Sequence, residues 1–258
     1  MRGWIVALFL VLAPAEAFAW GQTGHRVGGA LAEPLLTRKA RAEIAKVIGT
    51  ESLAQASTWA DDMRSNPDPF WQSTANPWHY VTVPPGKTYA EVGPPPEGDA
   101  AKALAEFAAT LKDPSAKLED KQRALRFAIH IIGDLHQPFH VGNGADRGGN
   151  DVQVTLFGAS TSLHAVWDSG MIDRRQLSYT EYAAFLSRRL TRDAVKAWTT
   201  PDPQVWIAES AAVRDGLYPP TGQTALSWRY LYDTRETLDQ RLAQSGVRIA
   251  AWLNALYG

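Results

Sequence analysis

The sequence predicts a mainly α-helical single domain with a small β element, and three observations support this prediction. Apolar residues recur at intervals of three and four over most of the chain, which is the spacing of an amphipathic helix. Alternation of apolar and polar residues, typical of a strand, is confined to two short stretches. Neither an internal repeat nor a linker divides the 258 residues, whose composition of 45% hydrophobic and 21% charged residues is that of an ordinary globular domain.

The first nineteen residues (1–19) are expected to be a secretory signal peptide. A basic residue precedes an apolar run at 4–12, and the segment ends in Ala-Phe-Ala, which is an A-x-A cleavage site. The run is too short to cross a bilayer, and Pro14 follows it closely. Cleavage after Ala19 would leave a mature domain of residues 20–258 without a membrane span. A secreted chain without cysteine indicates a bacterial periplasm or exterior.

Helical periodicity dominates both halves of the mature chain. The predicted helices cover 27–36, 39–48, 53–63, 100–111, 121–135, 179–198, 203–215, 224–244 and 247–256. The strand-like stretches are 151–157 and, more weakly, 80–83. Two segments rich in proline and glycine, 84–98 and 141–150, are expected to be loops.

Charge and composition exclude several function classes. The chain has 26 Lys plus Arg against 27 Asp plus Glu, so its formal net charge of -1 provides no general attraction for nucleic acid or anionic membrane. The absence of cysteine excludes disulfides, thiolate zinc sites and cysteine nucleophiles. Only histidine, carboxylate and backbone groups remain as metal ligands.

Two histidine–aspartate pairs are the strongest chemical signal. His130 and Asp134 are four residues apart on a predicted helix and therefore share a face, and His164 and Asp168 repeat this spacing. One such pair alone is more often a surface ion pair. Two pairs with further histidines between and before them indicate a multinuclear zinc site, since imidazole and carboxylate are the ligands that zinc accepts when thiolates are missing.

The two remaining histidines of this region have different expected positions. His140 follows Pro138, which ends the helix and lets the chain turn back, so that His140 can join a neighbouring site. His136 lies roughly 200° around the helix from Asp134. We therefore interpret His136 as a structural residue that points away from the site.

Six motifs occur in a fixed order along the chain: WGQTGH (20–25), STWADD (57–62), WHY (78–80), HIIGDLHQPFH (130–140), GGN (148–150) and LHAVWD (163–168). Each motif is weak alone, but together they resemble the S1/P1 nuclease family over nearly the whole mature chain. This resemblance implies a trizinc, single-strand-preferring nuclease and 3′-nucleotidase with the helical phospholipase C-like fold.

The resemblance also implies a ligand set for three zinc ions. The first zinc would be held by Asp61, His79, His130 and Asp134, the second by His140, His164 and Asp168, and the third by Trp20, His25 and Asp134. Asp134 would thus bridge two metals. Trp20 would bind through its α-amino nitrogen and carbonyl oxygen, which requires signal cleavage and an amine deprotonated from a pKa of roughly 8.

The same resemblance assigns catalytic and substrate-binding roles. Asp61 would also orient the attacking water, and Arg64 would contact the phosphate as it gains charge. Tyr80 would be the stacking platform for a nucleobase, with Gly148 and Asn150 forming the rest of the slot. The expected substrates are single-stranded nucleic acid and nucleotides, and no obligate protein partner is evident.

Two departures from the family pattern and two alternatives remain. Thr82 stands where the fungal enzymes carry a base-reading Asp, and the cysteines that form disulfides in fungal and plant members are missing. The alternatives are a phospholipase C-type phosphodiesterase and a non-catalytic zinc-binding periplasmic protein. Tyr80 and the 148–150 turn favour nucleic acid over lipid, and open coordination positions favour catalysis over storage.

Overall fold

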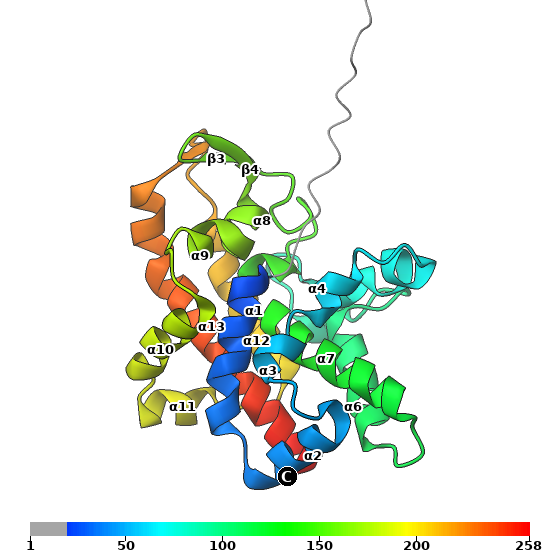
Figure 1. Cartoon of the computed structure of the whole chain (residues 1–258). Coiled ribbons are helices and arrows are strands. Elements are labelled where there is room, and N and C mark those ends of the chain that lie inside the picture. Colours follow the sequence, from blue (N-terminus) through cyan, green and yellow to red (C-terminus); the bar gives the residue numbers. More distant parts are fainter. Residues whose placement is uncertain (1–19) are drawn as a thin grey trace, which may run out of the picture.

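Three helices form the centre of the fold in the computed structural model, which describes residues 20–258 (Figure 1). Helix α1 (Gln22–Ala32) packs along α13 (Trp228–Tyr257), and both contact α7 (Leu118–Asp134). Gly246 permits the close approach of α13 to α1, since a Cβ atom there would lie 2.5 Å from the Cβ of Leu31. The C-terminal half of α7 is almost wholly buried between its neighbours.

Further helices pack around these three. The other helical elements are η1 (Glu33–Leu35), α2 (Arg38–Ile48), α3 (Leu53–Ala56), α4 (Trp59–Met63), η2 (Phe70–Thr74), η3 (Asn76–His79), α5 (Tyr89–Val92), α6 (Ala100–Lys112), η4 (Pro138–His140), α8 (Leu163–Ala165), η5 (Val166–Gly170), α9 (Met171–Asp173), α10 (Tyr179–Arg189), α11 (Arg192–Trp198), α12 (Pro203–Arg214) and η6 (Asp215–Leu217). The prediction of a mainly α domain is therefore confirmed.

Two small sheets make up the β element. Strand β1 (Val81–Thr82) pairs in parallel with β2 (Val141–Gly142). Strands β3 (Gln153–Leu156) and β4 (Ala159–Ser162) form an antiparallel hairpin, and β5 (Ala225–Leu226) joins β3 in parallel. The first sheet brings the segment after His79 beside the segment after His140, although 61 residues separate these histidines.

Aromatic side chains support the elements that carry the candidate site. Trp78, at the end of η3, packs edge-on against Phe107 and Phe127, with ring centroids 5.4 and 5.2 Å apart. In a second core cluster, the buried Trp167 donates its indole N–H to the hydroxyl of Tyr230, 2.8 Å away. The high tryptophan content of the chain therefore serves the core at these positions.

The structure corrects several predicted element boundaries. The predicted helix 179–198 is two helices, because the backbone is extended at Leu190 and Thr191, and the Thr191 hydroxyl caps a new helix by accepting from the N–H of Ala194. The predicted helices 224–244 and 247–256 are the single helix α13, which continues through Gly246 without a break.

Smaller corrections concern the short elements. The predicted helix 53–63 is divided into α3 and α4, and the strand-like stretches 151–157 and 80–83 shorten to β3 and β1. The expected loops 84–98 and 141–150 contain α5 and β2. Among the described residues no helix is long and apolar enough to span a membrane, and the predicted signal peptide lies outside the described residues.

Candidate metal centre

The last turn of α7 carries the first two candidate ligands. His130 and Asp134 lie on one face of the helix, as their spacing predicts, and the Nε2 atom of His130 is 3.1 Å from Oδ2 of Asp134. Both side chains are fully buried. Glycine at 133 leaves room for a third group, because a Cβ atom there would lie 2.8 Å from Nδ1 of His25.

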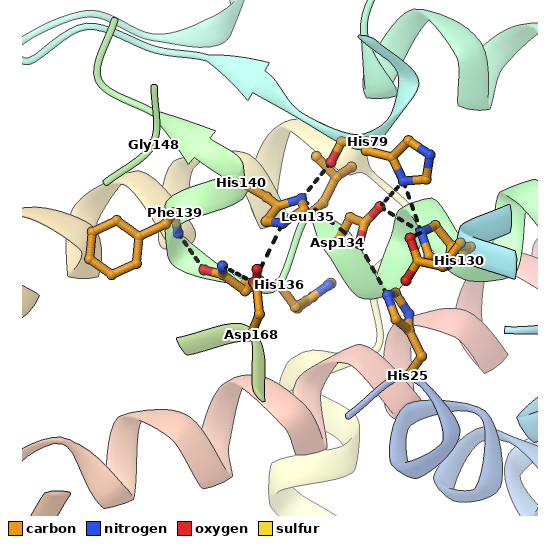
Figure 2. Close-up of polar contacts among 12 residues, drawn as sticks. His25, His79, His130, Asp134, Leu135, His136, Phe139, His140, Gly148 and Asp168 are labelled. Carbon is orange, nitrogen blue, oxygen red and sulfur yellow. Dashed lines mark hydrogen bonds and ion pairs between the residues drawn. The ribbon is translucent and has the colours of Figure 1, made fainter. Parts of the chain in front are cut away.

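Side chains from three other elements converge on Asp134 (Figure 2). From α1, His25 brings Nε2 to 3.3 Å from Asp134 Oδ1, and from η3, His79 brings Nδ1 to 3.2 Å from Oδ2. On α4, Asp61 has its Oδ1 atom 3.7 Å from Nε2 of His130. Two overlapping groups with the geometry of a metal site result, namely His25 with His130 and Asp134, and Asp61 with His79 and His130.

A third group of candidate ligands lies beside the first two. Helix α7 ends at Asp134, and the turn η4, which begins at Pro138, brings His140 back so that its Nδ1 atom is 3.8 Å from Asp134 Oδ1. His164 on α8 and Asp168 on the π-helical turn η5 are 3.1 Å apart, between Nε2 and Oδ2. His140 Nε2 lies 3.7 Å from Asp168 Oδ1. The three side chains are all buried.

Backbone carbonyls orient three of the imidazoles. The Nδ1 atoms of His130, His140 and His164 lie 2.6 to 2.7 Å from the carbonyl oxygens of Ser57, His79 and Gly148, respectively. Each ring therefore donates its Nδ1–H to the backbone and directs its Nε2 atom inward. This is the arrangement by which proteins fix the tautomer and direction of metal-binding histidines.

The polar atoms at the centre fit a set of divalent cations. Several buried atoms there have no hydrogen-bond partner, namely both ring nitrogens of His25, Oδ1 of Asp61, Oδ1 of Asp134, Nε2 of His140, Nε2 of His164 and Oδ2 of Asp168. Leaving a buried polar group unpaired costs about 1–3 kcal/mol each. Coordination to metal ions would satisfy these atoms together, so the residues fit a metal centre.

Electrostatic coupling ties proton and metal binding together. Burial alone would lower the pKa of His130 and His140, but nearby carboxylates, above all Asp134, raise each to about 9. Burial also opposes ionisation of Asp134, yet the two histidines hold its pKa well below the usual range. A cation must therefore displace protons from these histidines near neutral pH, and its affinity should rise with pH.

Trp20, the candidate ligand at the amino terminus, lies close to the group formed by His140, His164 and Asp168. Trp20 is fully buried, and the backbone N–H of the next residue, Gly21, donates to the carbonyl of Asp168 over 2.7 Å. Both Trp20 and His25 pack against Gly133, since a Cβ atom built there would lie 2.8 Å from His25 Nδ1 and 3.9 Å from the Trp20 ring. The first of the described residues thus lie beside the buried cluster.

Arg64 lies beside Asp61 at the end of α4. Its guanidinium is 3.9 Å from Asp61 Oδ1, and its side chain is 17% exposed. The side-chain amide of Gln72 donates to the Arg64 carbonyl and fixes the backbone there. A cation held at the rim next to a buried acid is suited to contact an anionic substrate.

The predicted base-slot residues occupy neighbouring segments. Tyr80 immediately precedes β1 and is 43% exposed, while Gly148 lies in the loop that follows β2. Gly148 has a φ of +63°, and a Cβ atom there would collide with the Phe139 carbonyl, so only glycine fits. Asn150 directs its amide to the Arg147 carbonyl, within its own turn.

His136 faces away from the cluster, towards α13. Its Nδ1 atom donates to the carbonyl of Ile132, and its Nε2 atom accepts from Arg248 over 3.1 Å. Burial and the neighbouring arginines hold its pKa well below the usual range, so the ring is neutral. Both ring nitrogens are therefore engaged in the core.

We predict opposite effects on metal content for two alanine variants on the same segment. His130→Ala should lose bound metal because its Nε2 atom lies within reach of both Asp134 and Asp61. His136→Ala should keep full metal occupancy while unfolding at a lower temperature, because it removes one hydrogen-bond partner of the buried Arg248. Elemental analysis with thermal unfolding of both variants tests this. Equal metal loss in the two variants would show that His136, too, faces the candidate metal centre, contrary to this assignment.

One buried side chain at the centre was not predicted from the sequence. Gln137 donates its amide N–H to Oδ1 of Asp168 over 2.6 Å, and its own backbone N–H bonds to the Asp134 carbonyl. A neutral amide carries no metal-ligand signature. The only available signal was its position between Asp134 and His140.

The helical fold thus contains a buried centre of carboxylates and imidazoles that could hold metal ions. The profile of the S1/P1 Nuclease family matches residues 20–258. The chain therefore belongs to the S1/P1 nuclease family, and it is a hydrolase that cleaves phosphodiester bonds.

Curated relatives from a plant and two fungi cover nearly the whole chain. Endonuclease 2 of Arabidopsis thaliana is 28% identical over 98% of this chain and 96% of its own length. Nuclease S1 of Aspergillus oryzae is 28% identical over 93% of this chain and 92% of its own length. Nuclease P1 of Penicillium citrinum is 27% identical over 93% of this chain and 98% of its own length. The phospholipase and non-catalytic alternatives are not favoured by these relationships.

Proposed function

We propose that this chain is a secreted nuclease that holds three zinc ions and hydrolyses single-stranded DNA and RNA, with additional 3′-nucleotidase activity. The observation that carries the proposal is the convergence of three buried histidine–carboxylate groups around Asp134, with unpaired atoms pointing to their centres. Zinc suits this donor set, since imidazole and carboxylate are its usual ligands where thiolate is missing.

The proposed ligands follow from the family resemblance and agree with these contacts. One zinc would be held by Asp61, His79, His130 and Asp134, another by His140, His164 and Asp168, and another by His25, Asp134 and the amino-terminal nitrogen and carbonyl oxygen of Trp20. The distances from Asp134 to His25, His79 and His130, all between 3.1 and 3.3 Å, support its bridging role.

The chain's own residues then have distinct tasks in hydrolysis. Bound zinc supplies an acidified water and stabilises negative charge on the phosphoryl and leaving oxygens. Asp61 orients the attacking water by accepting a hydrogen bond, which suits a carboxylate at the edge of the cluster. Arg64 places its guanidinium against the phosphate as charge builds up there.

Substrate selection is assigned to the rim above the centre. Tyr80 offers a half-exposed ring on which any base can stack, and burial raises the pKa of its phenol, so the ring is uncharged at neutral pH. Gly148 and Asn150 would form the opposite wall, in a loop whose position is fixed by the β1 and β2 pairing. Stacking of this kind requires an unpaired base.

Secretion is the proposed route by which the amino terminus becomes available. Cleavage after Ala19, to the periplasm or exterior of a bacterium, would create the free α-amino group of Trp20. Until then this nitrogen belongs to a peptide bond, which is a poor metal ligand. Export and completion of the site would coincide.

Adding one residue before Trp20 should therefore impair one of the metal sites. A mature protein that begins with Met ahead of Trp20 keeps every side-chain ligand but replaces the free amine by an amide, so one zinc should be bound more weakly than in the protein that starts at Trp20. Zinc titration of the two proteins, produced in parallel, measures the difference. Full activity and zinc content in the extended protein would contradict the role of the amino terminus.

Metal analysis and a three-substrate assay test the proposed function as a whole. The mature protein should contain three zinc ions and cleave single-stranded DNA and RNA, while leaving phosphatidylcholine intact. Fewer than two tightly held zinc ions would refute the metal assignment. Zinc binding without cleavage of any nucleic acid would instead favour a non-catalytic protein.

A further inference from the structure

Gln137 connects the parts of the candidate metal centre that carry Asp134 and Asp168. It lies three residues beyond Asp134, its side chain is fully buried, and its backbone N–H donates to the Asp134 carbonyl over 2.9 Å. Its side-chain amide reaches Asp168 on η5, 31 residues further along the chain. Figure 2 shows Asp168 meeting the segment after α7 at this point.

The orientation of the Gln137 amide is fixed by a second hydrogen bond. The backbone N–H of Phe139 can only donate, and it lies 2.5 Å from the Gln137 side chain, which must therefore present its oxygen there. The amide nitrogen then faces Asp168 Oδ1 over 2.6 Å. The chain turn at Pro138 thus determines which end of the amide meets the carboxylate.

This contact makes the two oxygens of Asp168 unequal. Oδ1 accepts the hydrogen bond from Gln137, whereas Oδ2 has no hydrogen-bond partner and lies 3.1 Å from Nε2 of His164. Oδ2 and the inward Nε2 atoms of His140 and His164 are all buried and unpaired. These three atoms are therefore the ones directed to a common cation.

We infer that Gln137 is a positioning residue that holds Asp168 with its unpaired Oδ2 atom available to the metal that the His140, His164 and Asp168 group would hold. The inference rests on the proposed zinc centre. The amide neutralises no charge, but it satisfies one oxygen of a buried carboxylate and prevents the group from rotating. Outer hydrogen-bond partners of metal ligands typically contribute 10- to 100-fold to metal affinity.

Gln137→Glu is the sharpest test, because glutamate has the same shape and can still accept from Phe139 N–H. It removes the donor to Asp168 and sets a second carboxylate against the first. One zinc equivalent should dissociate at about 10- to 100-fold higher free Zn²⁺ than in the parent, while the other equivalents keep their affinity. Chelator competition counts the equivalents, and anomalous diffraction at the zinc edge locates the weakened site.

A pair of methionine variants separates positioning from general loss of stability. Gln137→Met and Gln244→Met each remove a buried, hydrogen-bonded amide, but Gln244 contacts Arg241 on α13, away from the candidate ligands. Only Gln137→Met should lose a zinc equivalent, and excess Zn²⁺ should restore its nuclease activity.

Two results would overturn this inference. Unchanged affinity of every zinc equivalent in both Gln137 variants would remove Gln137 from the metal site. Uniform weakening of all equivalents, matched in Gln244→Met, would reduce its role to packing. A parent protein without zinc at the His140, His164 and Asp168 group would refute the proposed function itself, so the two failures are distinguishable.

Discussion

Replacing Asp134 by asparagine should reduce nuclease activity by about three orders of magnitude or more. Asp134 is fully buried, and its two oxygens face imidazoles from α1, η3 and α7 within 3.3 Å. Asparagine keeps the shape but removes the negative charge that would be shared by two cations. A thousandfold loss in kcat/KM corresponds to about 4 kcal/mol of transition-state stabilisation, which is within the range that metal ions supply.

Asp120→Asn on the same helix is the matched control. Asp120 forms a partly exposed ion pair with Arg123 in the first turn of α7, far from the cluster along the helix axis. This variant should keep the zinc content and activity of the parent. An Asp134→Asn protein that retains parental activity, or that loses activity with full zinc content, would contradict the bridging role.

Single-stranded substrates should be cleaved roughly a hundredfold faster than matched duplexes. A base that stacks on Tyr80 must first leave its partner, and extracting it costs a few kcal/mol. The net charge of -1 offers no general attraction to a duplex that would offset this cost. Thr82, in place of an acidic base-reading residue, should keep base selectivity weak.

Tyr80→Ala is the variant that tests the slot. Cleavage of matched single-stranded and duplex oligonucleotides at moderate salt should show a raised KM for the single strand in this variant, with zinc content unchanged. Tyr232→Ala is a suitable control, because Tyr232 is also exposed but lies on α13. Equal rates on the two substrates, or an unimpaired Tyr80→Ala enzyme, would remove the base slot while leaving the metal centre intact.

The fold class could be predicted because helical periodicity is a local signal, whereas the element boundaries depend on contacts between distant segments. A break at Leu190 and Thr191 has no proline or glycine to mark it, and the cap appears only in the structure. Gly246 resembles a helix end in sequence, yet packing against α1 carries α13 through it. The hairpin strand β4 is too polar to alternate clearly.

The candidate site was predictable where chemistry and spacing coincide. Histidine and aspartate four residues apart on a helix are readable from sequence, and so is the return of the chain after Pro138. The role of Gln137 could not be predicted from the sequence, because it depends on Asp168 lying next to the segment that follows α7. The buried arginines Arg241 and Arg248, which pair with the half-buried Glu209 behind His136, were missed for the same reason.

The convergence on Asp134 also makes each bound ion a cross-link between distant parts of the polypeptide. His25, His79 and Asp134 lie on α1, η3 and α7, so the two coordination spheres that share Asp134 would close loops comparable to those of long-range disulfides, which this cysteine-free chain lacks. Closing a loop of about 100 residues is worth ~4.7 kcal/mol in the chain-entropy account. Chelation would then open these loops together, and resistance to heat and proteases would depend on zinc supply in the surroundings as much as on the apolar core.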